Sequence, residues 1–248
     1  MQFLFSLFCA KLIVPQEVGG DGVRYSNIVP GRFIDRPNRF IAHVELDGQV
    51  QTVHVKNTGR CRELLVPGAT VYVQHSDAPN RKTAWDLIAV EKGERLINMD
   101  AQAPNKVFGE WAQAGNFLPN LTLLKPETTY KTSRFDFYAE AHGRRHFIEV
   151  KGVTLEQNGI VRFPDAPTER GVKHIEELIS ATQDGYESWI CFVIQMSNVK
   201  WFEPNDATHP QFGDALRRAE QAGVRILALD CEVTAETLAI KGKIPVRL

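Results

Sequence analysis

Two carboxylates and a lysine lie close together in the middle of the chain, in segments whose alternating pattern predicts β-strands. Asp136 belongs to the first segment, and Glu149 and Lys151 belong to the second. Because successive side chains of a strand point to opposite faces, Glu149 and Lys151 share a face. A hairpin turn at residues 142–145 would bring Asp136 to the same polar patch. A surface cluster of ion pairs, each worth under ~1 kcal/mol, is the alternative interpretation.

Such a patch suits Mg²⁺, with Mn²⁺ as a substitute, because proteins hold Mg²⁺ with one or two carboxylates together with water and substrate phosphate. The chemistry that follows is metal-assisted phosphodiester hydrolysis. A bound cation lowers the pKa of a water molecule and offsets the charge that builds up on the phosphate. The ammonium group of Lys151 would stabilise the nucleophile or the scissile oxygen.

A second candidate site lies at the start of a predicted helix. Thr168 is suited to cap this helix, and Arg170, Lys173 and His174 follow at spacings of three or four residues. A helix N-terminus attracts phosphate through its unpaired N–H groups, and basic side chains strengthen this attraction. The pattern predicts a phosphate clamp, and an ordinary capped helix with a solvated basic face is the alternative. Asp165, in the preceding loop, is interpreted as an Asx turn or as an acid behind the metal ligands.

The N-terminal part of the chain carries a third candidate, a basic loop just after a predicted strand. It comprises Asn57, Thr58, Gly59, Arg60 and Arg62. A glycine tolerates a positive φ, so Gly59 is expected to turn backbone N–H groups outward toward a phosphate. Aromatic platforms beside a basic groove bind single strands. The chain offers further candidates for such a surface in Arg39, Phe40, Tyr72 and Trp85. Each of these aromatics, taken alone, is more often a core residue.

The elements that position this loop are short strands between residues 23 and 100. Residues 39–46 and 49–56 alternate in polarity around Asp47-Gly48, a strong hairpin signal. A short helical segment is expected at 61–65, and further strands at 69–75 and 85–91. About five strands with one small helix predict a five-stranded OB-type barrel, with an SH3-like barrel as the alternative.

After residue 100 the pattern changes to mixed α/β. Helices are predicted at 104–115, 168–182 and 210–222, and strands at 121–130, 135–141, 146–155, 189–196 and 224–229, with a short strand at the C-terminus. Residues 189–196 are apolar apart from Gln195, which indicates a strand buried on both faces. The expected organisation is an N-terminal extension (1–22), a barrel (23–100) and an α/β domain with a mixed sheet (101–248).

Composition narrows the functional classes. The chain has 248 residues and a formal net charge of −1, which excludes a strongly basic nucleic-acid-binding tail. The balance is uneven, because residues 24–62 hold seven basic and three acidic side chains, whereas residues 176–248 hold seven basic and eleven acidic ones. The barrel is therefore the better candidate for a polyanion surface. The apolar stretch at residues 3–14 is too short to span a membrane, and four scattered cysteines favour the cytoplasm.

Four segments resemble the sugar fermentation stimulation protein family: residues 57–59, 133–137, 149–155 and 163–174. The chain also resembles the PD-(D/E)xK nuclease superfamily in the order of its elements, which are a helix with an acid, a strand with Asp, a strand with Glu-x-Lys and a further helix. The resemblance runs from about Arg32 to the C-terminus. It implies an OB domain joined to a nuclease-like α/β domain, with DNA as the partner.

The resemblance also assigns roles. It implies that Asp136 and Glu149 bind the metal, that Lys151 is the catalytic cation, and that Glu110 on the first helix completes the metal shell; a solvated carboxylate is the alternative for Glu110. It adds Arg134 to the residues expected to bind nucleic acid. We therefore expect a Mg²⁺-dependent nuclease acting on DNA, single-stranded or branched, with RNA still open. No membrane and no nucleotide cofactor are expected, and a non-enzymatic DNA-binding regulator of sugar metabolism is the alternative.

Overall fold

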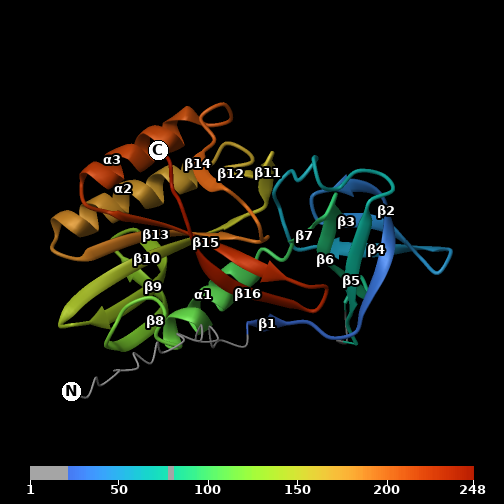
Figure 1. The fold of residues 1–248 in the computed structure, drawn as a ribbon, viewed down its shortest axis with the longest axis horizontal. Coiled ribbons are helices and arrows are strands. Elements are labelled where there is room, and N and C mark those ends of the chain that lie inside the picture. The colour runs from blue at the N-terminus through green and yellow to red at the C-terminus, as the bar shows by residue number, and fades with distance from the viewer. Residues whose placement is uncertain (1–21, 78–80) are drawn as a thin grey trace, which may run out of the picture.

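The computed structural model describes residues 22–77 and 81–248. The expected N-terminal extension, residues 1–22, lies outside this part except for Gly22. Figure 1 shows a small β-rich part beside a larger part in which helices cover a sheet. Within the described residues, none of the helices combines the length and the apolar character that a membrane span requires.

The small part is a closed five-stranded barrel of the OB type, as predicted. It contains β2 (Ile28–Asn38), β3 (Ile41–Leu46), β4 (Gln49–Val55), β5 (Thr70–His75) and β6 (Trp85–Lys92). Neighbouring strands pair in the order β4-β3-β2-β5-β6, and a parallel pairing of β4 with β6 closes the barrel. The short β7 (Arg95–Asn98) continues the sheet beyond β6.

Local sequence explains the turns of the barrel. Asp47 and Gly48 both have positive φ, 49° and 78°, which is the conformation that a two-residue type I′ hairpin turn requires. The expected short helix at 61–65 is instead a hydrogen-bonded turn, in which the N–H of Leu65 donates to the carbonyl of Cys61 over 2.9 Å. Cys61 itself has a positive φ of 45°, so its backbone cannot continue a right-handed helix.

The larger part is built on a mixed seven-stranded sheet. Its strands follow the order β1 (Val23–Arg24), β16 (Thr237–Ile244), β15 (Arg225–Val233), β13 (Glu187–Ile194), β10 (Arg144–Val153), β9 (Ser133–Ala141) and β8 (Leu121–Tyr130). The central β13 runs parallel to both of its neighbours, and the other pairs are antiparallel. β1 thus pairs with this sheet before the chain enters the barrel, although the sequence analysis placed everything from residue 23 in the barrel.

Helices cover both faces of this sheet (Figure 1). One face, which includes Ile148 and Cys191, packs against α1 (Ala103–Gln113). The opposite face, which includes Phe147 and Phe192, packs with α2 (Glu169–Gln183) and α3 (Pro210–Gln221). Alternate residues of the central strands are therefore buried on opposite faces, as the apolar run at 189–196 predicted.

A three-stranded sheet lies between these helices and the barrel. It pairs β11 (Leu155–Gln157), β12 (Ile160–Phe163) and β14 (Trp201–Pro204). Glu156 of β11 is 3% exposed and forms ion pairs with Lys92 (2.9 Å) and Arg95 (3.1 Å) of the barrel. Gln195, after β13, donates to the side-chain oxygen of Asn98 over 3.0 Å. Buried polar contacts therefore join the two parts of the molecule.

Candidate functional site

Asp136 lies at the point where β9 and β10 separate. The two strands pair from Ala141/Arg144 to Phe137/Ile148, and the pairing ends there. The carboxylate of Asp136 continues the hydrogen bonding in place of the backbone, because its Oδ2 accepts from the N–H of Val150 over 2.7 Å. The predicted hairpin turn makes this possible, since His142 and Gly143 take the positive φ values of a tight turn, 50° and 69°.

Glu149 and Lys151 lie on the face of β10 that packs against α2. The Glu149 carboxylate is 2% exposed, and its Oε1 contacts both the Lys151 ammonium and Nδ1 of His174. Its Oε2 is buried and has no hydrogen-bond partner in the described part of the chain. Buried polar atoms in native proteins are nearly always paired, so this carboxylate oxygen is free to accept a partner from outside the chain, a water molecule or a cation.

The two carboxylates affect each other's ionisation. Burial raises the pKa of Asp136, and the negative charge of Glu149 raises it further. Burial also raises the pKa of Glu149, but the hydrogen bond from His174 and the charge of Lys151 outweigh burial and hold it below its usual value. The charge of Glu149 is therefore compensated within the protein, whereas the charge of Asp136 is disfavoured.

Glu110 reaches the same region from α1. It lines a cavity of about 530 Å³ together with Asn105 and Asp136, and its Oε2 is buried without a partner among the residues described. Asn105 donates to Oδ1 of Asp136 over 2.6 Å, a contact that nothing in the sequence pattern signalled. Asp136 thus lines the same cavity as Glu110, and the charge of Glu149 raises its pKa.

The donor set suits a hard cation. It consists of carboxylate oxygens, two of which, Glu149 Oε2 and Glu110 Oε2, have no partner in residues 22–77 and 81–248. Across the same residues, no group of three or more His, Cys, Asp or Glu side chains converges in a ready metal-binding arrangement. One or two carboxylates with water and phosphate suffice for Mg²⁺, so Asp136 and its neighbouring carboxylates are the candidate ligands.

The predicted clamp at the start of α2 is divided between two environments. Thr168 caps the helix as expected, because its hydroxyl accepts from the N–H of Gly171 over 3.1 Å. Arg170 and Lys173 are exposed, and Lys173 lies 3.8 Å from Glu177. His174 is instead 5% exposed and faces Glu149. The His174 side chain therefore contacts Glu149 and does not face solvent.

The loop after β4 contacts the α/β part. The N–H of Arg60 donates to Oδ2 of Asp165 over 2.8 Å, and the N–H of Gly59 donates to the side chain of Asn57, also over 2.8 Å. The expectation of a positive φ at Gly59 is wrong. Glycine is required there by a close approach, because a Cβ would lie 2.5 Å from Oδ2 of Asp165.

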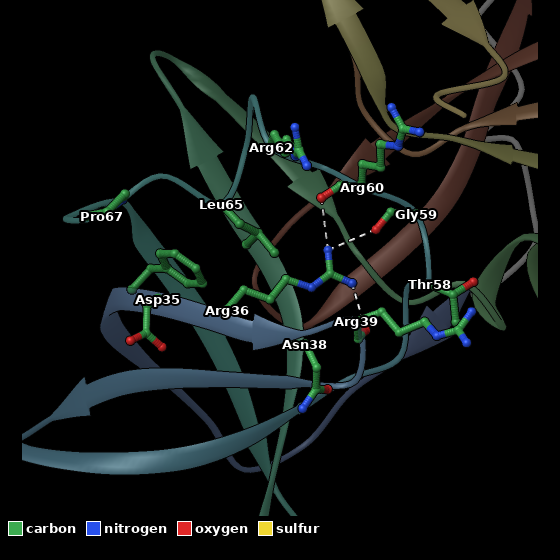
Figure 2. Close-up of a pocket in the computed structure, with 11 residues that line it drawn as sticks. Asp35, Arg36, Asn38, Arg39, Thr58, Gly59, Arg60, Arg62, Leu65 and Pro67 are labelled. Carbon is green, nitrogen blue, oxygen red and sulfur yellow. Dashed lines mark hydrogen bonds between the residues drawn. The ribbon is translucent and has the colours of Figure 1, made fainter. Parts of the chain in front are cut away.

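Arg36 holds this loop from the barrel side and was missed by the sequence analysis. Its guanidinium donates to four carbonyls, those of Asn57 (2.7 Å), Gly59 (2.9 Å), Arg60 (3.0 Å) and Arg39 (2.7 Å). Figure 2 shows Arg36 at the centre of this arrangement. An arginine in a strand gives no sign in the sequence that it will bind a loop more than twenty residues away.

The other predicted nucleic-acid contacts are scattered. Phe40 is 46% exposed, and the Arg39 guanidinium lies 5.1 Å from its ring centre. Tyr72 donates to Glu91 over 2.8 Å, and Trp85 is half-buried against the core. Arg134 is exposed and lies 3.5 Å from Glu127. Of the aromatic candidates, Phe40 is the most open to solvent.

Comparison with known proteins tests the predicted family. A model described as the SfsA N-terminal OB domain matches residues 34–99, and one described as the sugar fermentation stimulation protein RE domain matches residues 102–237. The chain belongs to the sugar fermentation stimulation protein family. The sugar fermentation stimulation protein homologs of Ruminiclostridium cellulolyticum and Clostridium beijerinckii are 58% and 57% identical to it, over 91% of this chain and the whole of each relative.

A solved structure of the family shares the fold over nearly the whole chain. It is described as the structure of Pyrococcus furiosus SfsA in complex with Ca²⁺, and it is 28% identical in sequence. The match has a TM-score of 0.84 and covers 93% of this chain and 100% of the other. The predicted family and the predicted architecture, an OB barrel followed by a nuclease-like α/β domain, are both confirmed.

Proposed function

We propose that this protein binds DNA and hydrolyses its phosphodiester bonds with a divalent cation held beside Asp136. The observation that carries the proposal is the buried Oε2 of Glu149, which has no partner within the described residues and belongs to a carboxylate whose charge raises the pKa of Asp136. A carboxylate whose charge is disfavoured by a neighbouring carboxylate gains from a cation placed beside it. Mg²⁺ is the first choice, and Mn²⁺ is its substitute.

The roles of the side chains follow from their contacts. Asp136 and Glu149 would hold the cation, and Glu110 would complete its surroundings from the cavity side. When bound, the cation supplies an activated water and neutralises charge on the phosphate. Asn105 and the N–H of Val150 fix the orientation of Asp136. His174 fixes Glu149, and the ammonium of Lys151 places a positive charge next to the same carboxylate.

The solved relative supports this assignment. The Pyrococcus furiosus protein was described in complex with Ca²⁺, which, like Mg²⁺, prefers oxygen ligands. The relative shares the family and the fold of this chain, so a family member is known to accept a hard divalent cation. For this chain, the proposal rests on Asp136 and Glu149 themselves.

A cleavage assay tests the proposal. Single-stranded, duplex and branched DNA, and RNA, are incubated with the full chain in Mg²⁺, Mn²⁺ or EDTA. We expect metal-dependent cleavage of DNA that falls about a thousandfold in Asp136→Asn and in Lys151→Met, because each change removes several kcal/mol of transition-state stabilisation. Asp214→Asn, on the exposed side of α3, is the matched control and should cleave normally. No cleavage of any substrate, or equal cleavage by Asp136→Asn, would contradict the proposal.

A second function, a DNA-binding regulator without catalysis, is favoured by one observation. Glu149 is already neutralised by Lys151 and His174, so the fold does not need a metal to keep this carboxylate buried. This alternative predicts DNA binding in EDTA that is unchanged in Asp136→Asn and falls with salt as counterions are released. The cleavage assay separates the two functions, because only the first predicts a product.

A further inference from the structure

A cavity of about 480 Å³ opens on the barrel between the β2–β3 turn and the loop after β4 (Figure 2). Its wall is partly apolar, because the buried side chains of Phe33 and Leu65 line it. Exposed polar residues, among them Asn38 and Thr58, line the remainder. The volume lies within the range of pockets that hold a small organic ligand, which is also the scale of a single nucleotide.

One arginine of the cavity holds the loop after β4, and the other three have no ion-pair partner among the described residues. Arg36 is committed to the carbonyls of the 57–60 loop and therefore fixes the shape of the cavity. Arg39, Arg60 and Arg62 also line the cavity, and they are exposed without an ion-pair partner in the part of the chain that the structure describes. Figure 2 shows the Arg60 side chain extending away from Arg36. Three unpaired guanidinium groups, against the single carboxylate of Asp35 in the same lining, favour an anion with several oxygens, such as phosphate.

An exposed aromatic ring lies beside Arg39, one of the arginines that line the cavity. Phe40 is 46% exposed and follows Arg39 directly, and the Arg39 guanidinium lies over its ring. Such a ring, next to basic side chains, gives a base a surface for stacking. A paired duplex keeps its bases stacked inside, so only an unpaired base is able to use both the ring and the apolar wall of the cavity.

The arginine cavity adjoins a second cavity that extends toward β10, the strand that carries Glu149. Thr58 and Gly59 line it and also line a second cavity, of about 270 Å³, between the barrel and the α/β part. This second cavity extends to Gly152, the residue after Lys151 on β10. A strand that leaves the arginine cavity over the 57–60 loop therefore approaches the strand that carries Glu149 and Lys151.

We infer that the arginine cavity of the barrel binds one unpaired nucleotide and its flanking phosphates, and that the protein holds its substrate as a single nucleic-acid strand running from the barrel toward β10. The direction in which the strand runs rests on the proposed function, because that function places the cleavage site at Asp136 and Glu149. The shared chemistry of DNA and RNA strands, a base with flanking phosphates, is what the cavity recognises.

Fluorescence anisotropy with labelled 12-nucleotide single strands of DNA and RNA, and with a blunt DNA duplex, tests the inference. The full chain is used in EDTA, so binding is measured without cleavage. We expect single strands to bind more tightly than the duplex. Arg60→Ala/Arg62→Ala should weaken single-strand binding tenfold or more at low salt and make the salt dependence shallower, by about 0.7 per lost phosphate contact. Phe40→Ala should weaken it about fivefold or more through lost stacking.

The matched control is Lys241→Ala/Lys243→Ala, which removes the same charge from exposed positions of β16 away from the cavity. It should bind single strands like the wild type. Equal losses in both double variants, or no loss in Arg60→Ala/Arg62→Ala, would overturn the inference. The arms with DNA and RNA show which sugar the natural strand carries, and tighter duplex binding would also overturn the inference.

The outcome separates this inference from the proposed nuclease. If strand binding depends on Arg60 and Arg62 but no substrate is cut in Mg²⁺, the cavity inference holds and the nuclease proposal fails. If the wild type cuts DNA and Arg60→Ala/Arg62→Ala cuts single strands with an unchanged KM, the nuclease proposal holds and the cavity inference fails.

Discussion

The barrel and the seven-stranded sheet hold their charged side chains in opposite ways. Arg39, Arg60 and Arg62 lie exposed at the barrel cavity without ion-pair partners in the described residues. Asp136 and Glu149 lie largely out of solvent and are held by side-chain and backbone donors. Exposed, unpaired charges bind and release a polyanion at little cost to the fold, whereas buried charges are positioned rigidly and affect stability. The first arrangement is suited to reversible binding and the second to positioning a reacting group.

The largest expected effect on stability lies on the sheet side. Glu149→Ala removes the carboxylate that pairs with Lys151 and His174, so two partners lose their contact inside the protein. Breaking a buried pair from one side costs about 3 kcal/mol or more. Urea unfolding measures this loss. On the barrel side, Arg60→Ala/Arg62→Ala should change the free energy of unfolding by under about 0.5 kcal/mol. Similar losses in Glu149→Ala and in this double variant would show that the two regions do not differ in how their charges affect stability.

The loop between the two regions is the next test. Gly59→Ala places a Cβ 2.5 Å from Oδ2 of Asp165 and 2.9 Å from Oδ1 of Asn57, so these oxygens must move away from the N–H groups of Arg60 and Gly59 that donate to them. Overpacking of this kind costs about 2 kcal/mol. Gly242→Ala is the control, since a Cβ there meets nothing within 4 Å. The cost of Gly59→Ala should shrink in an Asp165→Ala background; an unchanged cost would show that Asp165 does not impose the glycine.

A smaller loss than that of Gly59→Ala is expected at the contact between Glu156 and the barrel. Burial raises the pKa of Glu156, but the hydrogen bonds from Lys92 and from the N–H of Gly159, with the charge of Arg95, hold it below its usual 4.5. A carboxylate with a lowered pKa stabilises the fold above its unfolded pKa, and this stabilisation is lost as the pH falls through the folded pKa. Glu156→Gln should therefore cost about 1 kcal/mol at pH 7, since its partners are partly exposed.

The same variant gives a pH signature. The difference in unfolding free energy between the wild type and Glu156→Gln should shrink as the pH falls below about 4.5 and through the lower pKa of the folded state, because the wild-type carboxyl then becomes neutral as well. Urea unfolding at pH 7 and at pH 3.5 measures the difference. Glu232→Gln, an exposed position, is the control. A difference that stays constant with pH would show that the charge of Glu156 does not join the two parts.

Sequence reasoning worked where the signal was local. Asp47-Gly48 and Thr168 carry their structural role in their own residue types, because a type I′ turn needs positive φ and an N-cap needs a hydroxyl or carboxyl group. The alternation around Asp136 and Glu149 likewise sufficed to place them on adjoining strands. β2 gave no clear strand signal, since Pro30 and Pro37 lie within it.

Long-range contacts were beyond such reasoning. Helical spacing groups His174 with Arg170 and Lys173, but only the packing of α2 against β10 turns His174 toward Glu149. The need for a glycine at position 59 depends on Asp165, more than a hundred residues away. The strands β11, β12 and β14 are only three or four residues long, so their periodicity is too brief to read.

Equilibrium binding of Mn²⁺, followed by electron paramagnetic resonance, tests the central claim most directly, because it needs no substrate and no turnover. The account predicts that the wild type binds the ion, that Asp136→Asn loses this binding, and that Asp214→Asn keeps it. Binding of Mn²⁺ that is the same in Asp136→Asn as in the wild type, or no binding by the wild type, would contradict a cation site at Asp136 and Glu149.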